Sequence, residues 1–98
     1  MDDSTIKEII RIDLGVSVEA VEYDRLIDMM ISRAKRAIEE EGITIQDNDE
    51  DGALVEQYAA WLLRKRKENA PFPRMLRYQL NNRLLSEKME KSEETEEE

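Results

Sequence analysis

Residues 47–52 are the part of the chain whose residue types come closest to a chemical motif. They read Asp-Asn-Asp-Glu-Asp-Gly, which places oxygen ligands at alternate positions before a glycine, as in the first half of an EF-hand calcium loop. The twelfth position of such a loop needs a bidentate glutamate, and here it is Tyr58. The preceding helical pattern also stops too early, at Gly42. We therefore expect an acidic loop that caps the next helix, and no metal site.

The rest of the composition argues against catalysis. The 98 residues contain no histidine, no cysteine and only three glycines. Histidine is the usual general base near neutral pH and a frequent metal ligand, and phosphate-binding loops are built from glycines. Carboxylates are abundant, but they fall on predicted polar faces, where nothing would shift their pKa values for acid–base work. We predict a protein that is not an enzyme and uses no cofactor and no disulfide.

Basic residues gather in one segment of an acidic chain. The net charge is −9, yet residues 64–89 carry eight Lys/Arg against two Asp/Glu. Residues 1–63 have a net charge of −10 and residues 90–98 one of −5. The run 64–67 suits the last turn of a helix because cations interact favourably with the helix dipole there. The same segment could instead bind an acidic protein surface or the phosphates of a nucleic acid.

Apolar residues recur at steps of three and four, which predicts an all-α domain. The pattern gives a short helix that Ser4 caps and that ends near residue 14, with Ile6, Ile9 and Ile10 on one face and Ile12 beside them. A long helix follows, capped by Ser17 and stopped by Gly42. A third begins near Asp49 or Asp51, and a fourth spans about residues 74–89. We expect the two longer helices to be antiparallel and the fourth to project.

The connections and ends complete the predicted architecture. Ile43 and Ile45 should dip into the core from a connector. The helical domain is expected to cover residues 1–89, and residues 90–98 to form a disordered acidic tail, since they offer nothing to bury. The acidic start is unlike a signal peptide, and no apolar run approaches the roughly 18 residues of a membrane helix. We expect a cytoplasmic protein, or one in a particle assembled there.

The fourth helix follows a proline-bounded hinge. Pro71 and Pro73 fix the turn, and Phe72 between them either plugs the core of the domain or docks in a neighbour's pocket. Within the helix, leucines recur every four residues, and other apolar residues are expected to widen the same stripe. The leucines are Leu76, Leu80 and Leu84, and the widening residues are Met75, Leu85 and Met89.

The order of these elements resembles the head–tail connector (adaptor) proteins of tailed phages, which form the ring between portal and stopper. Three stretches carry the resemblance. Ile-Ile-Arg-Ile-Asp at residues 9–13 precedes the long helix of residues 23–38. Leu-Val-Glu-Gln-Tyr-Ala-Ala-Trp-Leu-Leu follows at residues 54–63, and Pro-Arg-Met-Leu-Arg-Tyr-Gln-Leu-Asn-Asn-Arg at residues 73–83 is typical of prophage versions in Gram-positive bacteria. The resemblance covers roughly residues 5–89, without the acidic tail.

The resemblance implies a helical subunit of a ring that docks on the portal and extends the DNA channel in the virion. Its partners would be the portal protein, the stopper and further copies of itself, while DNA would pass without sequence-specific binding. The family's C-terminal arm commonly contacts the portal, which here corresponds to residues 72–89. Together with the basic run, the predicted partner-binding residues are Arg64, Arg66, Phe72, Arg74, Arg77, Tyr78, Asn81, Asn82 and Arg83.

The resemblance leads to one expectation about portal docking, and the basic segment leaves one alternative function open. Replacing both Arg77 and Arg83 by glutamate should weaken portal docking and leave the helix content unchanged. The alternative function is that of a small regulatory or nucleic-acid-binding helical protein, which would contact phosphates through residues 64–83.

Overall fold

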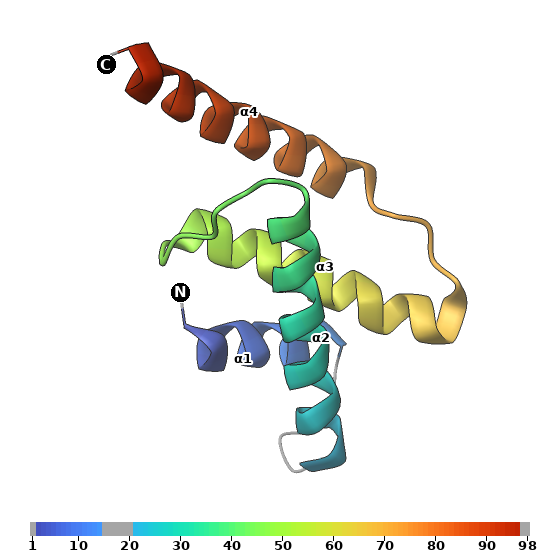
Figure 1. Cartoon of the computed structure of the whole chain (residues 1–98). Coiled ribbons are helices and arrows are strands. Elements are labelled where there is room, and N and C mark those ends of the chain that lie inside the picture. The colour runs from blue at the N-terminus through green and yellow to red at the C-terminus, as the bar shows by residue number, and fades with distance from the viewer. Residues whose placement is uncertain (1, 15–20, 97–98) are drawn as a thin grey trace.

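Four helices make up the computed structural model, which describes residues 2–14 and 21–96 (Figure 1). They are α1 (Asp3–Leu14), α2 (Val21–Glu40), α3 (Asp49–Glu68) and α4 (Arg74–Glu96). The described part of the chain contains no β-strand, so the all-α prediction is confirmed. The predicted cap at Ser17 lies outside the described residues.

Helix α1 starts at Asp3, two residues earlier than predicted. The carboxylate of Asp2 accepts a hydrogen bond from the backbone N–H of Thr5 at 2.9 Å, so Asp2, and not Ser4, supplies the capping oxygen. This bond lowers the pKa of Asp2. Ile6 and Ile10 are fully buried, whereas Ile12 is 73% exposed and lies off the packed face. An ion pair of 2.8 Å between Lys7 and Asp28 joins α1 to α2.

Helices α2 and α3 supply most of the core, but they are not antiparallel as predicted. Antiparallel neighbours would run alongside each other in any view, and in Figure 1 the two helices cross. Short loops produce antiparallel neighbours, whereas eight residues, 41–48, separate α2 from α3. The buried apolar residues are Ile27, Met30, Ile31, Ala34 and Ile38 on α2 and Leu54, Val55, Ala59, Ala60 and Leu63 on α3.

The connector from residue 41 to residue 48 is held at both ends. Gly42 has a φ of 106°, a conformation that side-chain-bearing residues avoid. A Cβ at this position would also lie 3.2 Å from the Leu84 side chain. Ile43 is buried and Ile45 packs half-buried against the core, as predicted. Asn48 then caps α3, because its side chain accepts a bond of 2.7 Å from the N–H of Asp51.

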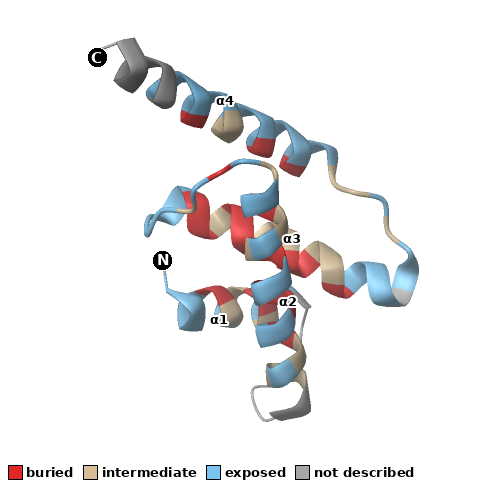
Figure 2. Ribbon diagram, in the orientation of Figure 1, coloured by how far each residue is buried: buried red, intermediate tan, exposed pale blue. Residues whose placement is uncertain are grey.

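Helix α4 packs beside α3 and runs in the opposite direction (Figure 1), with one side turned to the body (Figure 2). Leu76 and Leu80 are fully buried on that side and Leu84 is half-buried. Met75, Leu85 and Met89 are 57–69% exposed, so they do not widen this stripe. Residues at steps of one turn from the leucines share their face, and these three are offset to the opposite side.

The C-terminal end of α4 projects beyond the other helices (Figure 1), and the molecule measures 53 × 26 × 17 Å. The helix continues to Glu96, past the boundary at residue 89 where an unstructured tail was predicted. Residues 89–96 include four glutamates and one lysine, which are good helix formers, so a helix already started at Arg74 can extend through them.

Candidate interaction surface

Asp51 is a buried acidic side chain at the start of α3, only 2% exposed. Its carboxylate accepts hydrogen bonds from the backbone N–H of Gln46 at 2.8 Å and from Arg83 Nε at 2.9 Å. A buried carboxylate needs such donors because burial removes its hydrating water. Asp51 therefore ties the connector and α4 to the start of α3, and its oxygens are engaged by the protein itself.

Arg83 completes this buried network from α4. Its side chain is 12% exposed, and Nη2 donates to the carbonyl oxygen of Thr44 at 2.8 Å. Glu87 lies one turn further along α4, where Oε1 accepts from the Thr44 N–H at 2.5 Å and lies 3.5 Å from Arg83 Nη1. The hydrogen bond to Asp51 is the main cause that raises the pKa of Arg83. Arg83 was predicted to bind a partner, and the structure gives it a role within the fold.

Phe72 belongs to an aromatic cluster with Tyr58 and Trp61. The Phe72 ring lies 5.4 Å from that of Tyr58 and 4.7 Å from that of Trp61, in both cases edge to face, a favourable geometry for aromatic pairs. Trp61 Nε1 donates to the carbonyl oxygen of Ala70 at 3.1 Å. Burial, and secondarily the Glu41 carboxylate, raises the pKa of Tyr58. Of the two predicted roles for Phe72, the structure shows the one in the domain's own packing.

Arg77 lies at the edge of this cluster. Its guanidinium is 4.9 Å from the centre of the Phe72 ring, and Nη1 bonds Glu41 Oε1 at 2.7 Å. The Arg77 side chain is 44% exposed, so a partner can still reach it. Because Arg83 is buried, replacing Arg77 and Arg83 together would disturb the fold as well as any binding surface.

The other predicted partner residues are all exposed, but they do not form one patch. Arg64 and Arg66 lie in the last turns of α3, where Lys65 stands 5.0 Å from the Trp61 ring. Four further residues lie exposed on α4: Arg74, Tyr78, Asn81 and Asn82. The hinge of residues 69–73 separates these two groups, so the α4 group is the more coherent surface.

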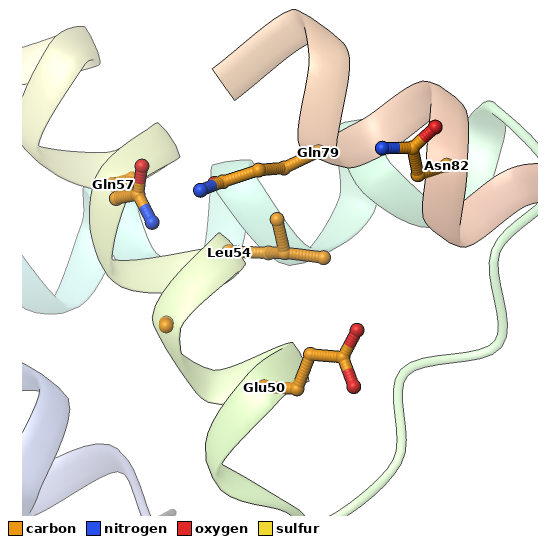
Figure 3. A pocket seen from close by; sticks show the side chains of 6 residues that line it. Glu50, Leu54, Gln57, Gln79 and Asn82 are labelled. Atoms are coloured by element: carbon orange, nitrogen blue, oxygen red, sulfur yellow. The ribbon is translucent and has the colours of Figure 1, made fainter. Parts of the chain in front are cut away.

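A pocket of about 250 Å³ opens between α3 and α4. Figure 3 shows Gln79 of α4 extending toward Gln57 of α3, with Leu54 beneath them, Glu50 further down on α3 and Asn82 beyond Gln79 on α4. Glu50 and Gln79 were not among the predicted partner-binding residues, because this groove depends on how α4 packs against α3. The amides and the one carboxylate suit contacts with a polar side chain of a partner. They are not a paired acid and base.

Glu56 is a second buried carboxyl group on α3, with 8% exposure. Burial, and then the neighbouring Asp13, raises the pKa of Glu56 to about 7. One of its oxygens, Oε1, has no hydrogen-bond partner among the described residues. Glu56 does not line the pocket between α3 and α4, and its raised pKa makes the stability of the fold depend on pH.

Among residues 2–14 and 21–96, no three acidic side chains come together in an arrangement that could hold a metal ion. In that same part of the chain, no helix has an apolar stretch of the length that crossing a bilayer requires.

Comparison with known proteins leaves the family open. No family model, no curated protein and no solved structure matches this chain. The functional argument therefore rests on the residues and their geometry.

Proposed function

We propose that this chain is a subunit of the head–tail connector ring of a tailed phage or prophage, which docks on the portal and extends the DNA channel. The proposal joins the sequence resemblance over residues 5–89 to one observation. A long C-terminal helix, anchored on one side, presents an exposed side that carries apolar and cationic residues. In such a particle the protein would work in the virion and reach it from the host cytoplasm.

The exposed side of α4 supports this role through its composition. Met75 and Tyr78 are 69% and 63% exposed, and apolar side chains of this size on a surface are typical of protein interfaces. Arg74 lies exposed beside them. Aromatic, methionine and arginine side chains are enriched at interfaces relative to the rest of a protein surface, so the set suits a protein partner.

The test is binding to the purified portal with variants that leave the core intact. Arg74→Glu combined with Asn81→Glu changes only exposed residues of α4 and is expected to lower portal affinity at least tenfold. Arg33→Glu combined with Ser32→Glu makes the same change of charge on exposed residues of α2 and serves as the control. Circular dichroism should be the same for both variants. Equal binding by the two variants, or no portal binding by the natural chain, contradicts the proposal.

The alternative is a nucleic-acid-binding protein, and one observation favours it. Arg64, Lys65 and Arg66 are exposed in consecutive positions at the end of α3, where they could contact phosphates. Such binding would weaken steeply with added salt, because contact with phosphates releases counterions. Tight binding of short duplex DNA with a steep salt dependence, together with no portal binding, would favour this alternative over the connector.

A further inference from the structure

A second apolar stripe runs along the exposed side of α4. It consists of Met75, Tyr78, Asn82, Leu85 and Met89, which we call the outer stripe. Its four large apolar members are 57–69% exposed, and Asn82 is also exposed. The spacing is 3, 4, 3 and 4 residues, which is the heptad repeat of a coiled-coil seam and not the one-turn spacing of the buried leucines.

The outer stripe lies on the side of α4 opposite the buried face. Successive residues turn by about 100° around a helix, which places Met75, Tyr78 and Leu85 roughly across the helix axis from Leu76 and Leu80. Figure 2 shows the same division, with the buried residues of α4 facing the body and the exposed ones facing away. Asn82 is the one stripe residue that also lines the pocket between α3 and α4, so a second helix could lie along the stripe with this pocket at its edge.

Asn82 occupies the middle of the stripe. A single asparagine at a seam position fixes the register and number of helices in a coiled coil, because the asparagine of one helix can bond only to a polar group at the same level of its partner. The best-matched partner for this stripe is an identical one, since Asn82 then meets Asn82.

The charges beside the stripe select the orientation. On one flank lie Arg74, Asn81 and Lys88, and on the other lie Gln79 and Ser86, all of them exposed. The pocket on this second flank is lined by Gln79 together with Glu50 of α3. In an antiparallel pair each flank would meet its own copy, so basic residues would face basic residues. In a parallel pair the basic flank of one helix faces the uncharged flank of the other, with Glu50 close to it. This arrangement brings opposite charges together and is favourable.

We infer that two copies of this chain pair through α4, with the helices parallel and the outer stripes in contact. The two bodies then lie on opposite sides of the pair. The contact spans 15 residues, or about 22 Å of helix. An interface of this length belongs to the smallest size class, so the dimer should be weak and should dissociate at low protein concentration. This inference does not rest on the proposed function, because it needs no portal. Where both hold, the dimer covers the surface that the portal binds.

The absence of cysteine from the chain permits a direct test with single-cysteine variants of the full-length protein. Met75→Cys, Asn82→Cys and Leu85→Cys place a thiol at three levels of the outer stripe. Met29→Cys is the control, because Met29 is 50% exposed on α2. Each variant is equilibrated in a glutathione redox buffer, and the disulfide-linked dimer is measured. Circular dichroism checks that all four keep the same helix content.

In a parallel pair, like residues lie at the same level, so all three stripe variants should form at least tenfold more linked dimer than Met29→Cys. Linkage of Asn82→Cys alone would overturn the parallel arrangement, since an antiparallel pair brings only the central residue to its own copy. Linkage of none above the control would overturn pairing between copies and leave a different protein as the occupant of the stripe.

Sedimentation of the natural chain supplies the second measurement. Its mean mass should rise toward that of a dimer between about 5 and 500 µM, as a weak interface requires, and Leu85→Glu should stay monomeric. A monomer mass throughout that range overturns the inference whatever the portal experiment gives. Failure to bind the portal alone would leave the dimer standing.

Discussion

The two faces of α4 carry similar apolar residues in opposite surroundings. The inner face places Leu76 and Leu80 in the core and adds Arg83 to the buried network around Asp51. The outer face holds Met75 and Leu85 in solvent. Burying a leucine side chain contributes about 1.5–3 kcal/mol, so the inner face holds the helix in place, and the outer face remains available for association.

This difference shows which residues can be changed to test function. Changes on the inner face should lower the stability of the monomer, and changes on the outer face should alter binding alone. Four predictions test that division, beginning with the one that should have the largest effect.

Arg83→Ala should lower the free energy of unfolding by about 3–5 kcal/mol, because it leaves the Asp51 carboxylate buried without its charged donor. Urea denaturation monitored by circular dichroism gives the value. Arg77→Ala is the matched control on the same helix. Its ion pair with Glu41 is partly exposed, so its loss should cost at most about 1 kcal/mol. Similar losses for the two arginines would show that the buried network does not hold α4.

Leu80→Ala should lower the free energy of unfolding by about 2–5 kcal/mol, as expected when a fully buried leucine leaves a cavity. Leu85→Ala makes the same chemical change on the outer face, where the side chain is 57% exposed. We expect a change within about 0.5 kcal/mol for that variant in the monomer. Thermal unfolding at low protein concentration compares the two, and equal losses would mean that the outer stripe is part of the core.

Glu56 extends the comparison, because at this buried carboxyl group burial and Asp13 outweigh the attraction of Arg64. Its pKa of about 7 in the folded protein lies above the ordinary value near 4.3 of an unfolded chain. The folded state therefore holds a proton that the unfolded state has lost, and Glu56 makes the protein less stable as the pH rises from about 4.3 to 7.

The measurement for Glu56 is the difference in unfolding free energy between Glu56→Gln and the natural chain. Glutamine mimics the protonated acid, so this difference should be near zero at pH 4 and favour the variant by about 1–2 kcal/mol at pH 8. Asp13→Asn should produce part of the same shift, since Asp13 is the second cause of the raised pKa. A difference that does not vary with pH would contradict the assignment.

Much of the fold can be predicted from local sequence patterns, whereas the roles of the residues predicted to form the binding surface cannot. The four helices and the inward Ile43 could be read from spacing, because each depends on neighbours in the chain. The crossing of α2 and α3 depends on the whole core and was missed. The partners of Arg83 are Asp51 and Thr44, more than 30 residues away in the sequence, so its cationic side chain resembled a binding residue. On α4, two offset apolar patterns were merged into one stripe.

The smallest predicted effect distinguishes the outer stripe from its flank. Asn82→Leu should tighten self-association about tenfold, or about 1.4 kcal/mol, because a polar residue at a seam position weakens the pairing that it aligns. Asn81→Leu makes the same change one residue away, on the basic flank, and should alter the association constant less than twofold. Sedimentation equilibrium of both variants measures this ratio. Both asparagines are exposed in the monomer, and Asn82 also lines the pocket beside α3, so equal unfolding free energies for the two variants would assign a difference in association to what lies against α4 in the complex. If both leucine variants associate equally, general apolar contact drives association and the heptad register does not.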